Sequence, residues 1–267
     1  MTDRPVDVDG RRVALRLTGS QQPAVVMLSS AGGGHDQWEQ LRELLGDTLC
    51  VSYGRPDIDG SDPLNSDLQS VPRTASWAAD HLHQLLRAAE IGPPYVLVGC
   101  SIGGWIADQF TAAWPSEVAG LVQIDPTFIT PIPRIEWNGT FEDADGGLTF
   151  SEPACRAELE ANVPSPPQRA VVISKAFGSV PLDVIERAWQ PLTPFEVDHG
   201  WRACQVEWAR RLHAVHLAAT TAGHHVQIDQ PALVAFVIRQ MLATTRAGTD
   251  HTLDPSDVAA AGGTLLS

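Results

Sequence analysis

The chain has 267 residues, of which 43% are apolar, and this is enough for the core of one large α/β domain. A net charge of −14 and a pI near 4.9 disfavour nucleic acid and anionic membranes as main partners, because both would be repelled. The four cysteines form no CxxC pair, no signal-peptide pattern precedes residue 30, and no apolar run reaches the length of a membrane span. We therefore expect a cytoplasmic protein with free thiols and no membrane partner.

Short apolar strands alternate with helices along the chain. The first two strands, around Asp9–Gly10, form a hairpin at residues 6–8 and 12–17. Further strands are predicted at 24–29, 48–53, 95–100, 120–124, 170–174 and 214–219, the last being the final strand. Helices are predicted at 35–45, 74–89, 102–114, 182–189, 201–212 and 231–245. This alternation predicts an α/β fold with a mostly parallel central sheet and helices on both faces.

Residues 126–168 break this rhythm. They contain seven prolines, an acidic stretch at 142–147 and one plausible helix near 152–161. Long insertions of this kind often cover a site, so we expect a small cap between two core segments, 1–125 and 169–247. The tail 248–267 is small and polar, and we expect it to be loosely held.

The pattern Gly-Cys-Ser-Ile-Gly at 99–103 lies where an apolar strand ends and a helix begins. This context is typical of a nucleophile elbow, a strained strand-to-helix turn that presents a serine hydroxyl. Gly99 and Gly103 give the backbone room to pass close to the serine. Ser101 is therefore the candidate nucleophile.

A serine nucleophile needs a base, and the base needs a carboxylate that orients it. His224 follows the predicted final strand, at the sheet edge where the elbow must lie, and Gly223 leaves it freer than its neighbour His225. Asp125 ends the strand after the elbow helix and is the favoured acid. Asp183 is the alternative, since the loop after the strand 170–174 holds Lys175, the only lysine, and no carboxylate.

Residues 30–34, Ser-Ala-Gly-Gly-Gly, follow the first buried strand and can present backbone N–H groups to an anion. We expect the oxyanion donors to be the N–H groups of Ala31 and Ile102. No Gly-Lys-Ser/Thr sequence follows, so this loop is not a phosphate-binding loop. His81 and His83 are two residues apart and cannot share a helical face, so we expect no metal site there. We also expect no cofactor.

From about residue 10 to 245 the chain resembles enzymes of the α/β-hydrolase fold, and most of all bacterial esterase-type serine hydrolases. The resemblance rests on Ser-Tyr-Gly-Arg-Pro at 52–56, Pro-Tyr-Val-Leu-Val-Gly at 94–99, Val-Ala-Gly-Leu-Val at 118–122 with Asp-Pro at 125–126, and Gly-His at 223–224 with Asp-Gln-Pro at 229–231. The resemblance implies that Ser101, Asp125 and His224 form the catalytic triad of a serine esterase.

Two departures from that family lie in the predicted site. Ser29–Ser30 stand where relatives usually have His-Gly, and Cys100 stands where they usually have His. Three interpretations therefore stay open: hydrolysis of an ester, lactone or thioester, a cofactor-free lyase, cyclase or perhydrolase reaction, and ligand binding with little turnover. We expect a small, partly apolar substrate. The sequence predicts neither its identity nor the oligomeric state.

Overall fold

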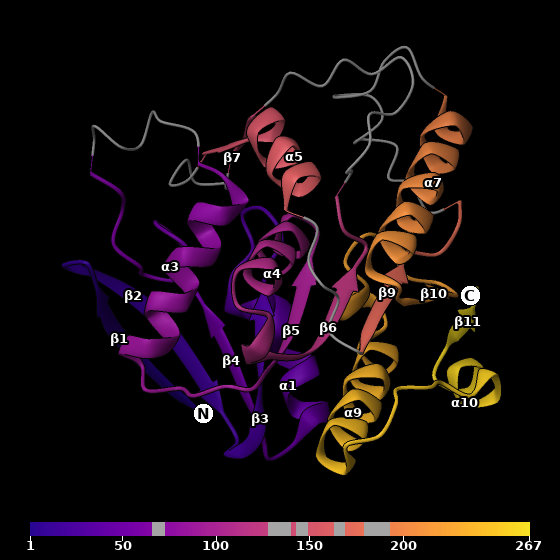
Figure 1. The fold of residues 1–267 in the computed structure, drawn as a ribbon, viewed down its shortest axis with the longest axis horizontal. Coiled ribbons are helices and arrows are strands. Elements are labelled where there is room, and N and C mark those ends of the chain that lie inside the picture. The colour runs from indigo at the N-terminus through magenta and orange to yellow at the C-terminus, as the bar shows by residue number, and fades with distance from the viewer. Residues whose placement is uncertain (66–72, 128–139, 143–148, 163–168, 179–192) are drawn as a thin grey trace.

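The computed structural model describes residues 1–65, 73–127, 140–142, 149–162, 169–178 and 193–267. In these residues a nine-stranded sheet forms the centre of the molecule, in the order β1-β2-β4-β3-β5-β6-β9-β10-β11 (Figure 1). Its strands are β1 (Thr2–Val8), β2 (Arg11–Thr18), β3 (Gln21–Leu28), β4 (Thr48–Tyr53), β5 (Tyr95–Cys100), β6 (Val118–Ile124), β9 (Ala170–Ser174), β10 (Val215–Ala219) and β11 (Gly263–Leu265). The run from β4 to β10 is parallel, and the edge strands are antiparallel. The predicted mostly parallel α/β sheet is confirmed.

Helices cover both faces of this sheet (Figure 1). The longer helices are α1 (Glu39–Leu45), α3 (Ala75–Ala88), α4 (Ile102–Ala113), α5 (Glu152–Ala161), α7 (Pro194–Leu212) and α9 (Pro231–Ala247). Short helical segments are the 3₁₀ turns His35–Trp38 and Pro115–Glu117, with α8 (Val226–Asp229) and α10 (Pro255–Ala260). The helix predicted at 182–189 lies outside the described residues.

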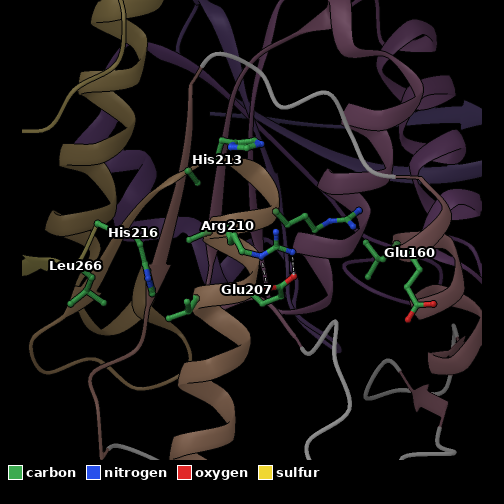
Figure 2. Close-up of a pocket in the computed structure, with 12 residues that line it drawn as sticks. Glu160, Glu207, Arg210, His213, His216 and Leu266 are labelled. Atoms are coloured by element: carbon green, nitrogen blue, oxygen red, sulfur yellow. Dashed lines mark hydrogen bonds and ion pairs between the residues drawn. The ribbon is translucent and has the colours of Figure 1, made fainter.

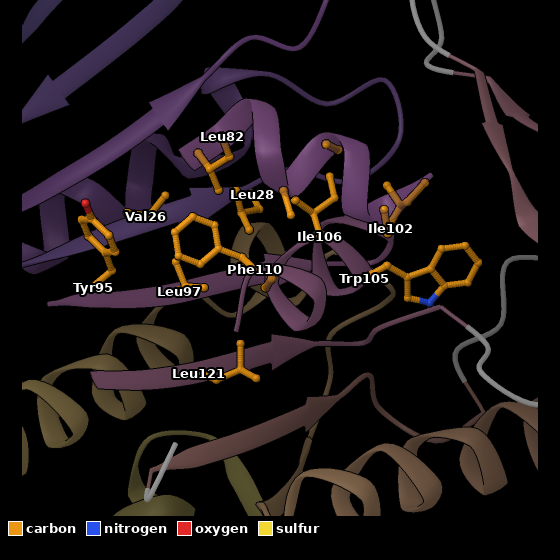
Figure 3. Close-up of a cluster of buried hydrophobic side chains, with 14 of the residues drawn as sticks. Val26, Leu28, Leu82, Tyr95, Leu97, Ile102, Trp105, Ile106, Phe110 and Leu121 are labelled. Carbon is orange, nitrogen blue, oxygen red and sulfur yellow. The ribbon is translucent and has the colours of Figure 1, made fainter. Parts of the chain in front are cut away.

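Side-chain alternation along the strands divides the core into two clusters. In β5, Leu97 packs with α3 and α4 on one face, whereas Val96 and Val98 pack with α1 and α9 on the other. Because both faces are covered, the parallel strands are apolar throughout, and they could therefore be predicted from apolar runs in the sequence. Figure 3 shows Ile106 and Phe110 of α4 among the strand residues of the first cluster.

Helix α7 begins earlier than the predicted residue 201. Its start is fixed by a capping box, in which the Thr193 hydroxyl accepts the Glu196 N–H and the Glu196 carboxylate accepts the Thr193 N–H. The helix ends at Leu212, and the next residue, His213, caps it in a left-handed conformation (φ 47°).

Within the predicted cap, the structure describes the ribbon of β7 (Thr140–Glu142) and β8 (Thr149–Ser151), and α5. Helix α5 docks on the core by polar contacts. The Ser76 N–H donates to the Glu158 carboxylate at 3.0 Å, and the Asn162 amide donates to Gln109 at 2.9 Å. Leu159 is buried in the cluster of α3 and α4.

The prediction of a loosely held tail is wrong, and 214–219 is not the final strand. Strand β11 pairs antiparallel with β10, and Val258 of α10 is fully buried. Gly263 allows this close approach, because a Cβ there would lie 2.8 Å from the Leu233 side chain. The strand was not predicted because the tail consists mostly of small and polar residues, and because it pairs with the outer edge of β10, which is distant in sequence.

In the described part of the chain, no helix is both long and apolar enough to cross a membrane.

Candidate active site

Ser101 lies on a sharp turn between β5 and α4. Its backbone has φ 56° and ψ −120°, a strained conformation for a residue with a Cβ. A Cβ at Gly99 would lie 2.4 Å from the Gly103 carbonyl oxygen, and one at Gly103 would lie 2.1 Å from that of Leu28. The turn therefore requires glycine on both sides of Ser101. The structure thus has a strained strand-to-helix turn at the predicted elbow.

His224 and Asp125 meet at the same edge of the sheet. His224 Nδ1 lies 2.7 Å from Asp125 Oδ2. Since a carboxylate can only accept, Nδ1 carries the proton of this contact, and in the uncharged form of the ring Nε2 is then an acceptor. Asp125 is fully buried, and its Oδ1 accepts the Lys175 N–H at 3.0 Å and the Trp201 Nε1–H at 2.9 Å.

The Ser101 turn is tied to this pair through the backbone. The Ser101 N–H donates to the carbonyl of Ile124, the residue before Asp125, at 3.1 Å. Among the contacts of the described residues, no hydrogen bond joins the Ser101 hydroxyl to His224; such bonds commonly tighten only when substrate is bound. The structure thus joins the favoured acid to the favoured histidine and sets Ser101 beside them. Asp183, the alternative acid, lies outside the described residues.

Arg55 binds the backbone just before Ala31, the predicted oxyanion donor. This buried guanidinium donates to the carbonyls of Ser29 at 2.9 Å and Ser30 at 2.6 Å. In the described part of the chain, no hydrogen bond occupies the backbone N–H of Ala31, and Ile102 stands in the first turn of α4, where helical N–H groups have no intrahelical partner. Both N–H groups are thus available as donors.

The two serines of this loop are buried and hydrogen-bonded inside the protein. Ser29 Oγ accepts the indole N–H of Trp38 at 2.7 Å. Ser30 Oγ accepts the Gln37 amide at 2.7 Å and lies 3.2 Å from His225 Nε2. Burial, together with the neighbouring His224, lowers the pKa of His225, so its ring is neutral at neutral pH. His225 therefore contacts the oxyanion loop, whereas its neighbour contacts the acid.

Cys100, the other departure from the family pattern, faces away from the site. Its side chain is fully buried in the cluster of α1 and α9. Burial strongly raises the pKa of its thiol, and the nearby Asp125 carboxylate acts in the same direction. A buried, protonated thiol is no competing nucleophile.

A second Ser-His-Asp grouping occurs beside β4. His35 Nδ1 lies 2.8 Å from Ser52 Oγ, and its Nε2 lies 3.6 Å from Asp59 Oδ2. Ser52 is fully buried and also accepts a hydrogen bond from Arg42 at 2.6 Å. A hydroxyl without solvent access cannot attack a substrate, so this grouping is structural.

A cavity of about 860 Å³ lies between α5, α7 and the start of β10 (Figure 2). His213 and Ala214, which line it, precede β10, so the cavity is at the amino end of that strand, opposite His224. Arg210 at its wall is paired with Glu207 at 2.5 Å. The cavity is separate from the site around Ser101.

Within the residues that the structure describes, no group of three or more His, Cys, Asp or Glu side chains is arranged to hold a metal ion. All four cysteines are free and buried.

Sequence reasoning missed three residues of this site: Arg55, Lys175 and Trp201. The sequence showed Arg55 only as part of the Gly-Arg-Pro stretch and gave no sign of its contacts. The loop of Lys175 was rejected as a source of the orienting acid because it holds no carboxylate. What that loop supplies is a backbone N–H. Nothing in the helical pattern around Trp201 signalled a contact with a residue far back in the chain.

The parallel sheet, the serine turn and the pair of a buried aspartate with a half-buried histidine together define an α/β hydrolase. The sequence profile of the Alpha/beta hydrolase family matches residues 25–261, and the chain belongs to this family.

Individual relatives are distant. The chain is 28% identical over 109 residues to the uncharacterized protein YqjL of Bacillus subtilis (strain 168), which is 40% of this chain and 41% of that protein. It is 32% identical over 121 residues, 43% of this chain and 40% of the relative, to a protein of the same organism with the provisional name 2-succinyl-6-hydroxy-2,4-cyclohexadiene-1-carboxylate synthase. The matches thus span about two fifths of these relatives. A thermophilic esterase from Thermogutta terrifontis has a similar structure, with a TM-score of 0.58, 18% identity, and coverage of 94% of this chain and 100% of that one. At this identity the likeness shows the fold alone.

Proposed function

We propose that the protein is a serine hydrolase that cleaves a carboxylic ester, lactone or thioester through an acyl-enzyme. The observation that carries the proposal is the 2.7 Å contact between His224 Nδ1 and Asp125 Oδ2, beside the strained turn of Ser101. A histidine held through Nδ1 keeps Nε2 free to accept the proton of a serine hydroxyl.

In the proposed reaction, Ser101 Oγ attacks the carbonyl carbon of the substrate while His224 Nε2 takes the hydroxyl proton. The N–H groups of Ala31 and Ile102 bind the oxyanion that forms. The tetrahedral intermediate then breaks its bond to the alcohol or thiol, which leaves with the proton from His224. Water, activated by the same histidine, attacks the acyl-enzyme in turn, and release of the acid restores Ser101.

The segment 126–168 is proposed as a cap over this site. Asn162, the residue after its helix α5, donates to Gln109 of α4, the helix that begins directly after the proposed nucleophile. We infer a small, partly apolar substrate and a cytoplasmic location.

The test is labelling with a fluorophosphonate probe, followed by turnover of short p-nitrophenyl esters. We expect one covalent adduct, located on Ser101 by peptide mass spectrometry, and loss of both adduct and turnover in Ser101→Ala. Ser52→Ala is the matched control, because it removes the serine of the second Ser-His-Asp grouping. It should keep the label on folded protein. Absence of both label and ester turnover in the wild-type protein would contradict the proposal.

A second candidate is a cofactor-free biosynthetic lyase or cyclase that uses the same three residues. It is favoured by the partial likeness to the provisionally named synthase and by Ser29–Ser30 in the oxyanion loop. Labelling of Ser101 without turnover of any ester, lactone or thioester would support this candidate over the hydrolase.

A further inference from the structure

Trp201 touches both members of the acid–base pair. Its indole Nε1–H donates to Asp125 Oδ1 at 2.9 Å. Its ring also stands edge-on to the His224 imidazole, at 89° with 5.3 Å between ring centroids. The residue comes from α7, which follows the proposed cap in the chain.

The aspartate is fully buried, so hydrogen bonds inside the protein must stabilise its charge. Oδ2 is engaged by His224, and Oδ1 by the Lys175 backbone and by Trp201. Of these donors, the indole can be deleted by substitution without touching the histidine or the main chain.

Ion pairs and hydrogen bonds next to Trp201 fix helix α7 in the position that the contact with Asp125 requires. Asp198, one turn before Trp201, pairs with the buried Lys175 ammonium at 2.8 Å and accepts the Gly178 N–H at 3.2 Å. Arg202 donates to the other oxygen of Asp198 at 3.0 Å and lies over the Phe177 ring. The indole is therefore seated by contacts on the turn before it and at the next residue.

We propose that Trp201 is a positioning residue of this active site, which fixes the Asp125 carboxylate and tunes how tightly that carboxylate holds the His224 proton. The inference rests on the proposed hydrolase function. A carboxylate that loses the indole donor keeps more negative charge at Oδ2 and binds the imidazolium proton more strongly. The base is then freed only at higher pH.

Titratable and charged groups around the Asp125–Trp201 contact belong to several elements. His225 interacts electrostatically with His224, Asp229 and Asp125. Lys175 after β9 and Arg202 on α7 both pair with Asp198. Substitution of Trp201 by an apolar ring leaves all of them in place, so a change in the pH profile reports the indole contact.

The experiment compares pH profiles of kcat/KM for wild type and Trp201→Phe with a p-nitrophenyl ester. We expect the acidic limb to move up by about half a pH unit. We also expect kcat to fall roughly tenfold, because the base is less well oriented, with KM nearly unchanged. Genetic incorporation of benzothienylalanine at position 201 keeps the shape of the ring and removes only the N–H, so it should give the same shift even if the phenylalanine variant folds poorly.

Trp208→Phe is the matched control. Trp208 lies on the same helix, and its buried indole donates to the Thr127 carbonyl at 2.8 Å and not to the Asp125 carboxylate. This variant loses a comparable hydrogen bond, yet its acidic limb should coincide with that of wild type. Coincident limbs for wild type and both Trp201 variants, on protein that fluorophosphonate still labels at Ser101, would overturn the inference. Failure of wild type to be labelled would instead overturn the hydrolase proposal.

Discussion

Replacing Asp125 with Asn tests whether the proposed catalytic pair sets the position of the proton on the His224 ring. The two donors on Oδ1, the Lys175 N–H and the Trp201 Nε1–H, are both fixed, so an amide at this position must turn its oxygen toward them. Its NH₂ group then faces His224 Nδ1, which must become the acceptor. The histidine is forced into the tautomer with the proton on Nε2 and can no longer take a proton from Ser101.

The size of the effect follows from this geometry. The substitution is isosteric and keeps both Oδ1 contacts, so the fold and the substrate affinity should change little. We expect kcat to fall by about 10⁴-fold, the scale of a wrong-tautomer substitution in a catalytic triad. This loss corresponds to about 5.5 kcal/mol of activation free energy. The rate of fluorophosphonate labelling, measured on variant and wild type at the same pH, should fall in parallel with ester turnover.

The same assay on Asp183→Asn decides between the two candidate acids. We expect that variant to keep wild-type turnover within a few fold. If Asp125→Asn keeps activity within tenfold of wild type while Asp183→Asn loses several orders of magnitude, our reasoning about the orienting acid is refuted and the assignment reverses.

Two further predictions concern stability. Gly103→Ala should lower the free energy of unfolding by at least about 3 kcal/mol in a urea titration, because its Cβ would lie 2.1 Å from the Leu28 carbonyl oxygen; Gly92→Ala, with nothing within 4 Å of its Cβ, should stay close to wild type. Burial lowers the pKa of His81 to about 4 from 6.5, so the unfolded chain takes up a proton first and stability is lost as pH falls through this window. Between pH 7 and 4.5, the free energy of unfolding measured in urea titrations should therefore fall by about 2 kcal/mol less in His81→Leu than in wild type. An equal fall in both proteins would contradict this cause.

Much of the fold was predictable because short local signals mark its elements. The helix Glu152–Ala161 and the strands Thr48–Tyr53 and Ala170–Ser174 have the bounds that the sequence predicted. Each strand is an apolar run set apart by polar or glycine-containing residues. The tail was mispredicted because Val258 and Gly263 carry no local pattern, and their place is set by the open edge of β10 and by the core beneath it.

The site divides in the same way. Ser101, His224 and Asp125 stand directly after strands or in the loop that follows one, so the rule that parallel strands end at one edge was enough to predict their neighbourhood. Arg55 and Trp201 act through hydrogen bonds to residues that are distant in sequence. Such contacts depend on how a loop packs against another loop or against a helix. The periodicity of residues along one element contains no information on this packing.

The sheet itself sets the distances within the site. The residue that follows each of two adjacent strands donates its N–H to the last part of the next strand: Ser101 to the Ile124 carbonyl at 3.1 Å, and Asp125 to the Ile173 carbonyl at 2.7 Å. Both residues have positive φ, 56° and 40°, which is unfavourable for side chains with a Cβ. The two hydrogen bonds continue the ladder of the parallel sheet past the strand ends and hold these strained conformations. The spacing of nucleophile and acid is therefore a property of the strand register, and loop flexibility cannot easily change it.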